Sequence, residues 1–167
     1  MLLLFIFAQA VCNLEENIYT IISEDWHLKP MDCFMQGVNI VSYPPFNVVP
    51  PVALYINGEE DVAKQGIIGF IGNYVALFPL KYTINRQRPG GEYERWDSSF
   101  PSGHTACAFT QAVIYSHHYP KYRVPLYLYA AVVGFSRIYL RKHYPTDVIG
   151  GAALGLLIGL LTVKLME

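Results

Sequence analysis

Charged residues are scarce in this sequence, and neither sign dominates. Aspartate, glutamate, lysine and arginine make up 15% of the 167 residues, and the formal net charge is −1; an average globular protein has roughly 25% charged residues. A chain without a basic excess has no field that would attract nucleic acid, so we expect no nucleic-acid partner. Hydrophobic residues reach 53%, which disfavours a soluble bundle whose helices would each need a polar face.

Cysteine is also rare, and no internal repeat or low-complexity tract is visible. The three cysteines, Cys12, Cys33 and Cys107, lack the spacing of metal ligands, and Cys107 reads as a packing residue in an apolar helix. We therefore expect no metal and no other cofactor. The length predicts a single integral-membrane domain over residues 1–167.

Long apolar stretches predict an all-α, polytopic membrane helix bundle. Apolar runs near 18 residues are long enough to cross a bilayer, and we expect such helices over residues 65–83, 102–117, 124–140 and 148–165. Residues 37–56 are apolar but contain Pro44, Pro45, Pro50 and Pro51. Four prolines cannot sit in a straight helix without loss of backbone hydrogen bonds, so a broken crossing is expected there.

The N-terminal stretch, residues 2–22, is interpreted as a first membrane helix. Ala8-Gln9-Ala10 resembles a signal-peptide cleavage site, but no basic residue precedes it and the apolar run before it is short. With Glu15 and Glu16 near the interface, this helix would bring the total to about six transmembrane helices, and it is the crossing that the composition supports least.

Glycines recur on two of the expected helices. Gly151, Gly155 and Gly159 are four residues apart in the last helix, and Gly66, Gly69 and Gly72 mark the helix over residues 65–83. Small residues along one face let helix backbones approach closely in lipid. These helices are therefore expected to pack tightly against a partner.

The expected crossings bring several polar clusters to one end of the bundle. The helix over residues 65–83 ends where the helix over residues 102–117 starts, the helix over residues 124–140 returns there, and the last helix leaves from there. The clusters at that end contain cations, two imidazoles and a carboxylate, namely Lys81, Arg88, His104, Arg137, His143 and Asp147.

This set of side chains suits phosphoryl transfer. Lys81, Arg88 and Arg137 can neutralise the oxygens of a phosphate, and arginine can bond two oxygens at once. Ser102 and Gly103 add a hydroxyl and a backbone N–H at a helix start, where an anion is favoured.

Two histidines permit a divided mechanism. One would attack phosphorus while the other protonates the leaving oxygen and later activates water. Asp147, four residues after His143, is the natural partner to orient that ring, which leaves His104 as the acid. The spacing alone also permits the two histidines to exchange roles.

The three clusters resemble the signature of the type 2 phosphatidic acid phosphatase superfamily. Its motifs match Lys81-Tyr-Thr-Ile-Asn-Arg-Gln-Arg88-Pro89, Pro101-Ser102-Gly103-His104, and Ser136-Arg137-Ile-Tyr-Leu-Arg-Lys-His143-Tyr-Pro-Thr-Asp147. The resemblance covers residues 81–147 in order, and each specified position is filled. It implies an α-helical, metal-independent phosphatase that forms a phosphohistidine. It further implies His143 as nucleophile, His104 as acid and base, Asp147 as partner, and phosphate binding by Lys81, Arg88, Ser102, Gly103 and Arg137.

The hydropathy of the chain, combined with this resemblance, favours a membrane enzyme that acts on a lipid phosphate. Lipid A 1-phosphate or phosphatidylglycerol phosphate is preferred, with an isoprenyl diphosphate or a non-specific acid phosphatase activity as alternatives. A catalytically silent membrane scaffold is an alternative of another class. The resemblance to small bacterial members implies the bacterial inner membrane, with the catalytic face periplasmic or extracytoplasmic.

Three further basic residues border the motifs. Arg86, Arg141 and Lys142 are candidates to contact a second acidic group of the substrate, or to face anionic headgroups of the surrounding bilayer. The sequence says nothing of the oligomeric state.

Overall fold

The protein is described by a computed structural model that covers residues 2–26, 28–43, 45–89, 91 and 97–167. Within these ranges all regular secondary structure is helical, as predicted. The helices are α1 (Leu2–Thr20), the π-helix η1 (Ile21–Asp25), α2 (Lys29–Ser42), α3 (Pro45–Ile56), α4 (Glu60–Ile84), α5 (Gly103–His118), the 3-10 helix η3 (Pro120–Tyr122), α6 (Arg123–Tyr139) and α7 (Pro145–Met166).

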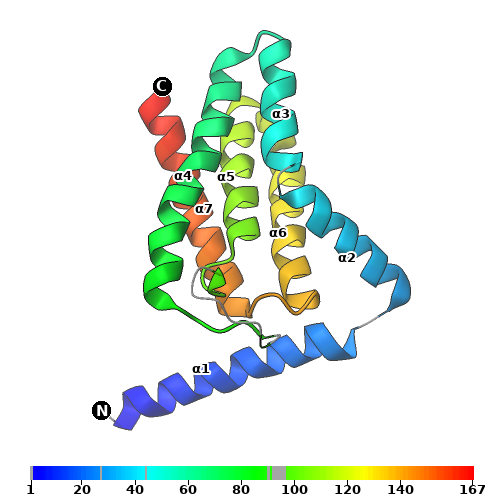
Figure 1. The fold of residues 1–167 in the computed structure, drawn as a ribbon, viewed down its shortest axis with the longest axis vertical. Coiled ribbons are helices and arrows are strands. Elements are labelled where there is room, and N and C mark those ends of the chain that lie inside the picture. The colour runs from blue at the N-terminus through cyan, green and yellow to red at the C-terminus, as the bar shows by residue number, and fades with distance from the viewer. Residues whose placement is uncertain (1, 27, 44, 90, 92–96) are drawn as a thin grey trace.

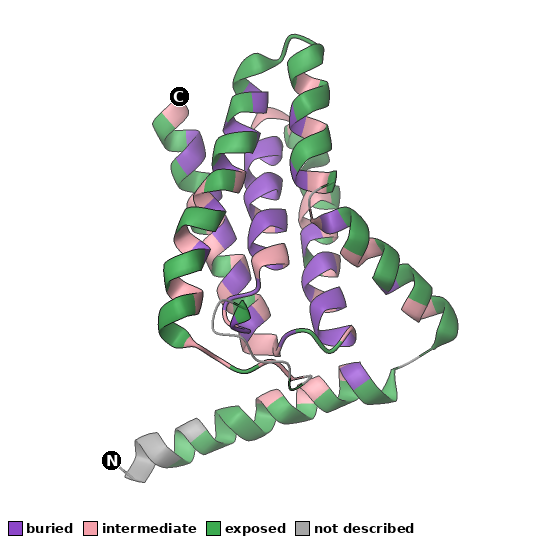
Figure 2. Ribbon diagram, viewed as in Figure 1, coloured by how far each residue is buried: buried purple, intermediate pink, exposed green. Residues whose placement is uncertain are grey.

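Helix α5 forms the centre of the bundle. Helices α3, α4, α6 and α7 run alongside it, whereas α2 approaches obliquely and α1 lies across one end (Figure 1). Nearly every residue of α5 between Thr105 and Ser116 is buried, while its neighbours are exposed on their outer faces (Figure 2). The predicted segments 65–83, 102–117, 124–140 and 148–165 all lie in helices of this bundle, apart from residues at their ends.

The bundle is apolar outside and partly polar inside. Large apolar side chains are exposed along α4 and α7, among them Val75 and Phe78 at 69% and 62% exposure. By contrast, Asn73, Thr110 and Gln111 are fully or almost fully buried. A soluble protein rarely exposes continuous apolar faces of this kind, whereas lipid favours them. By length and composition, α4 and α7 are the described helices that could cross a membrane.

The glycine face of α7 packs directly on α5. An added Cβ at Gly151 would lie 2.5 Å from the Ser102 carbonyl oxygen, and one at Gly155 would lie 2.2 Å from that of Ala106. At Gly159 a Cβ would lie 2.7 Å from the Cβ of Val113. The close approach predicted from glycine spacing is confirmed.

Gly155 should therefore tolerate no side chain. We expect Gly155→Ala to destabilise the protein by about 1–3 kcal/mol or more, because a backbone carbonyl cannot move aside as a side chain can. The measurement is the thermal unfolding midpoint in detergent. Gly37→Ala in α2 is the matched control, since nothing lies within 4 Å of a Cβ there. Equal midpoints for the two variants would contradict this account of the interface.

A chain of hydrogen bonds joins α4, α5 and α7 inside the bundle. The Asn73 side-chain amide donates to the Gly69 carbonyl at 2.9 Å and to the Thr110 hydroxyl at 2.8 Å. The Thr110 hydroxyl in turn donates to the Gly155 carbonyl at 2.9 Å. Buried polar groups need such partners, and in this network one side chain satisfies the next.

The apolar segment over residues 37–56 is broken, as its prolines predict. Helix α2 ends at Ser42 and α3 begins at Pro45, with extended backbone at Tyr43 between them. Pro44 lies outside the described residues. Pro50 and Pro51, however, lie inside α3. The break therefore precedes Pro45, and the second proline pair does not interrupt α3.

Helix α1 differs from the expected first crossing. It runs across the end of the bundle at a large angle to α4–α7 (Figure 1). Its second half is polar, and the Glu15 carboxylate is bonded to Arg86 and to the Thr146 backbone N–H at the base of the bundle. These bonds hold α1 at the bundle end, which is the physical reason that residues 2–22 do not run alongside the other helices.

Candidate active site

A cavity of about 170 Å³ opens at the end of the bundle that α1 crosses. Residues from each of the three sequence clusters line it, brought together by the ends of α4, α5 and α6 and by the loop before α7. The lining residues are Tyr43, Lys81, Arg88, Asp97, Gly103, His104, Arg137 and His143. The convergence expected from the crossing count is therefore present in the structure.

Arg88 links the nucleophile candidate to the loop before α5. Its Nη1 lies 3.2 Å from Nε2 of His143 and donates to the Lys142 carbonyl at 2.9 Å. Its Nη2 donates to Oδ1 of Asp97 at 2.6 Å. Because arginine can only donate, Nε2 of His143 must be the acceptor, and the ring proton belongs on Nδ1.

Arg137 is a buried cation at the cavity wall. It lies in the last turn of α6, is 5% exposed, and donates through Nη1 to the Asn39 side-chain oxygen. Its Nε has no hydrogen-bond partner among the described residues. A buried donor without a partner costs about 1–3 kcal/mol, so an acceptor bound in the cavity would remove that cost.

Lys81 approaches the same cavity from the last turn of α4. Its ammonium donates to the Ser98 carbonyl. The segment around Ser98 is fixed to the end of α4, because the Arg86 backbone N–H donates to the Ser98 hydroxyl at 2.9 Å and the Ser99 N–H donates to the Arg86 carbonyl at 2.7 Å.

His143 and Asp147 are buried together at the start of α7. The His143 ring is 2% exposed and the Asp147 side chain is fully buried. Nδ1 of His143 lies 3.7 Å from Oδ2 of Asp147, which is longer than a hydrogen bond. Catalytic hydrogen bonds are often long without substrate and shorten when it binds.

Asp147 is itself held by several donors. Its Oδ2 accepts the Tyr144 backbone N–H at 2.8 Å and the Ser99 hydroxyl, while its Oδ1 accepts Arg86 at 2.7 Å. Its backbone carbonyl accepts the Ser102 N–H at 2.9 Å, which joins the second motif to the third. The carboxylate is thereby fixed beneath the His143 ring.

His104 lies in the first turn of α5 and stacks on Tyr43. The two rings are 4.3 Å apart between centroids, with an interplanar angle of 21°. Tyr43 comes from the break between α2 and α3. No motif spacing indicates this contact, because Tyr43 is far along the chain from all three motifs.

Ser102 and Gly103 start α5 as expected, but they differ in exposure to the cavity. Gly103 lines it, whereas Ser102 is not among the lining residues and its hydroxyl accepts from Thr105 at 2.9 Å. Ser102 occupies the N-cap position without a side-chain capping bond. The geometry therefore favours Gly103 as the phosphate contact of this pair.

The three bordering basic residues have different surroundings. Arg86 is bonded to Glu15, Thr146 and Asp147. The guanidinium of Arg141 donates twice to the Ser23 carbonyl, at 3.1 and 3.0 Å. These two arginines bind the N-terminal segment rather than lining the cavity; Arg141 and Lys142 are exposed, and Arg86 is half-buried.

Several of the described residues at or around the cavity lie outside the sequence motifs. Among them are Tyr43 and Asp97 in its wall, Ser98 on Lys81, Asn39 on Arg137, and Ser99 on Asp147. Asp97 and Ser99 could have been sought in the polar loop before α5, but nothing in the spacing marked Asn39 or Tyr43. In the described part of the chain, no group of three or more His, Cys, Asp or Glu side chains is arranged to hold a metal ion.

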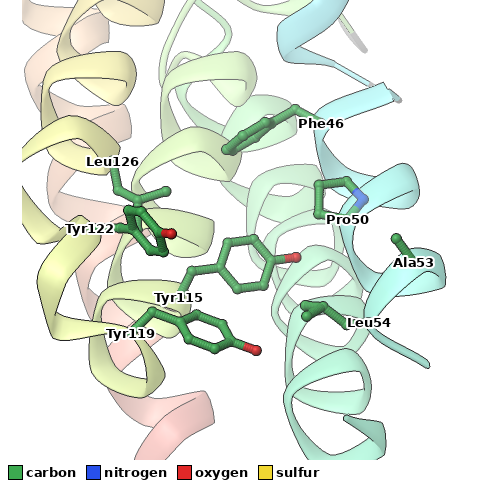
Figure 3. Close-up of a pocket in the computed structure, with 8 residues that line it drawn as sticks. All are labelled: Phe46, Pro50, Ala53, Leu54, Tyr115, Tyr119, Tyr122 and Leu126. Atoms are coloured by element: carbon green, nitrogen blue, oxygen red, sulfur yellow. The ribbon is translucent and has the colours of Figure 1, made fainter. Parts of the chain in front are cut away.

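A larger cavity of about 350 Å³ lies between α3, α5 and the start of α6 (Figure 3). It is lined by Phe46, Pro50, Ala53, Leu54, Tyr115, Tyr119, Tyr122 and Leu126. These side chains are apolar or tyrosine, so this cavity offers neither cations nor a nitrogen nucleophile. Of these two cavities, the smaller one is lined by cations and imidazoles.

A helical bundle with an apolar exterior and with cations, two imidazoles and a carboxylate around one cavity is the arrangement expected of a membrane protein that handles phosphate groups. The sequence profile of the PAP2 superfamily matches residues 66–167. The chain belongs to the PAP2 superfamily. The family resemblance drawn from the three motifs is confirmed.

Known relatives share parts of this chain. It is 42% identical over 83 residues to a lipid A 1-phosphatase of Porphyromonas gingivalis, over 47% of this chain and 18% of that protein. It is 38% identical over 130 residues to the undecaprenyl-diphosphatase BcrC of Bacillus subtilis, over 70% of this chain and 65% of that protein. Both matches span less than two thirds of the relative's own length.

Two crystal structures share the fold. Aquifex aeolicus LpxE superposes with a TM-score of 0.79 at 29% identity, over 90% of this chain and 95% of that chain. A transmembrane PAP2 type phosphatidylglycerolphosphate phosphatase from Bacillus subtilis gives a TM-score of 0.79 at 26% identity, over 93% and 86%.

Proposed function

We propose that this protein is a membrane phosphatase that hydrolyses a lipid phosphate monoester or diphosphate through a phosphohistidine on His143. The observation that carries the proposal is a single cavity lined by three cations and two imidazoles, in which Nη1 of Arg88 lies 3.2 Å from Nε2 of the buried His143. The unpaired Nε–H of Arg137 points to an anion as the occupant. Such preorganised donors stabilise the charge that develops on a transferring phosphoryl group.

In this mechanism Nε2 of His143 attacks phosphorus, and the bond from phosphorus to the lipid oxygen breaks. His104 gives its proton to the departing oxygen, so the lipid leaves as an alcohol, or as a monophosphate when the substrate is a diphosphate. His104 then takes a proton from water, whose oxygen attacks phosphorus and releases inorganic phosphate. Lys81, Arg88, Arg137 and the Gly103 N–H would hold the phosphoryl oxygens throughout.

The relatives and the apolar surface of the bundle support the proposed substrate class. Relatives and structural neighbours are named for lipid A 1-phosphate, phosphatidylglycerol phosphate and undecaprenyl diphosphate. We favour lipid A 1-phosphate or phosphatidylglycerol phosphate. The isoprenyl diphosphate is the second candidate, because the match to the undecaprenyl-diphosphatase covers the larger share of this chain.

The helix arrangement favours five crossings rather than six. In this proposal α2 and α3 make one broken crossing, α4 to α7 make four, and α1 rests at the surface beside the site (Figure 1). The N-terminus then lies on the catalytic side and the C-terminus on the other. We place the protein in the bacterial inner membrane with its catalytic end facing the periplasm or exterior.

The test is a panel of purified lipid phosphates assayed for released phosphate in detergent. We expect release from at least one of the three lipid classes, inhibition by vanadate, and full activity in a chelator. Rapid acid-free quenching with radiolabelled substrate should trap label on His143. No release from any lipid, by protein that unfolds cooperatively on heating, would leave the silent scaffold as the better account.

The pH dependence should reveal the buried nucleophile. Burial lowers the pKa of His143 to about 4, with Arg88 and Arg137 lowering it further and the Asp147 contact opposing them. The unperturbed value for histidine is ≈ 6.5. The ring should therefore stay neutral and nucleophilic as pH falls below 6.5, and be protonated only near 4. We expect the acid limb of the pH profile of kcat/KM to lie near pH 4. An acid limb near pH 6.5 would contradict a buried nucleophile.

A further inference from the structure

We propose that Glu15 of α1, acting through Arg86, is a positioning residue for the Asp147–His143 pair. This inference rests on the proposed function, because it assigns roles to side chains that support the nucleophile. Neither Glu15 nor Arg86 lines the cavity. Any effect of their side chains on turnover is therefore indirect, and Asp147 is the site carboxylate that the Arg86 guanidinium bonds.

The contacts form one continuous chain from the surface helix to the nucleophile. Glu15 Oε2 accepts Nη2 of Arg86 at 2.8 Å, and Nη1 of the same guanidinium donates to Oδ1 of Asp147 at 2.7 Å. Asp147 then faces Nδ1 of His143 through its other oxygen. Arginine suits this place because its planar fork can serve two carboxylates at once.

The guanidinium is fixed from further directions. Its Nη1 also donates to the Thr146 hydroxyl at 2.6 Å, and its Cζ lies 4.3 Å from the centre of the Tyr144 ring. Glu15 additionally accepts the Thr146 backbone N–H at 3.1 Å. The first turn of α7 is thus bound to α1 both directly and through Arg86.

Burial makes this arrangement sensitive to the loss of one member. The side chain of Asp147 is fully buried, and those of Glu15 and Arg86 are 12% and 29% exposed. Removing one charge from a close set of this kind leaves its partner unpaired in a region of low dielectric. Without Glu15, the guanidinium is no longer held on both sides and its hold on Asp147 weakens.

The test compares Glu15→Gln with Glu16→Gln in the full-length protein. Glu16 is the next residue on α1 and is exposed, so its replacement controls for charge and for the surface helix. We expect Glu15→Gln to lower kcat about tenfold with KM within twofold of wild type, and Glu16→Gln to change neither. Arg86→Met should lower kcat further than Glu15→Gln does. The kcat of Arg86→Lys should fall between those of wild type and Arg86→Met, because an ammonium keeps the charge but not the planar, two-sided geometry of the guanidinium.

The pH profile separates positioning from simple anchoring of α1. Once Arg86 is gone, the ionised form of Asp147 is less stabilised and the His143 imidazolium faces a less neutralised carboxylate. Both changes move the acid limb of kcat/KM to higher pH. We expect that shift in Arg86→Met. Glu15→Gln removes a negative charge instead, so there the acid limb should move to lower pH; unfolding midpoints are measured alongside.

Two outcomes would be distinguishable failures. If wild-type protein releases phosphate normally and Glu15→Gln matches Glu16→Gln in kcat and pH profile, the positioning role is overturned while the proposed function stands. If wild-type protein releases no phosphate from any lipid, the proposed function itself fails.

Discussion

Replacement of His143 by alanine is expected to lower kcat by about four to six orders of magnitude, the scale seen when a covalent nucleophile is deleted from an enzyme. The loss is large because the variant keeps the cations of the cavity but has no atom to form the phosphoenzyme. Released phosphate from the preferred lipid, followed over hours, is the measurement. Binding of inorganic phosphate should persist, since Arg88 and Arg137 remain.

The control for this experiment is His117→Ala. His117 lies in the last turn of α5, at the far end of the bundle, where its ring pairs with Glu167 at 2.8 Å. We expect His117→Ala to have the kcat of wild type. Phosphate release by His143→Ala within tenfold of wild type would remove His143 as the nucleophile.

Asp147→Asn is expected to cost about three to four orders of magnitude in kcat. Exchange of the aspartate behind a catalytic histidine for asparagine has an effect of about 10⁴ where the histidine then adopts the wrong tautomer. Here the change also places an amide between donors that need acceptors, because the Tyr144 N–H, the Ser99 hydroxyl and Arg86 all bond the two carboxylate oxygens. The measurement is kcat with KM determined separately.

The matched control is Asp61→Asn, because Asp61 is an exposed carboxylate in the first turn of α4. This substitution should leave kcat unchanged. Because a buried carboxylate with this many donors also contributes to stability, the unfolding midpoint of Asp147→Asn must be measured at the assay temperature. A folded variant that retains more than a third of wild-type kcat would show that His143 does not need this partner.

The sequence was sufficient to predict the features that depend on local composition and on the number of membrane crossings. Apolar length placed α4 to α7, and the alternation of crossings put Lys81, His104 and Asp147 at one end. Glycine spacing identified the face of α7 that lies on α5, because only a residue without Cβ permits that approach. The three motifs identified the family.

What the sequence could not supply depends on contacts between distant segments. Residues 2–22 have the length and apolarity of a crossing. The bonds from Glu15 to Arg86, 71 residues away, and to the Thr146 backbone N–H show why α1 stays at the bundle end. Tyr43 reaches His104 because the chain turns between α2 and α3, which no spacing encodes. The contacts of Arg86 and Arg141 with the N-terminal segment also join residues far apart in the chain, so no local pattern indicates them.

The hydrogen bonds through Asn73, Thr110 and Gly155 set the depth of the catalytic end relative to the middle of the bundle. Along their helices, Lys81 is eight residues from Asn73, His104 six from Thr110 and Asp147 eight from Gly155, or about 9–12 Å at 1.5 Å per residue. In lipid no water competes for these bonds, so sliding one helix past another would strand polar atoms in hydrocarbon. We therefore expect these bonds to keep Lys81, His104 and Asp147 at the same relative depth, even where the surrounding bilayer thins or thickens.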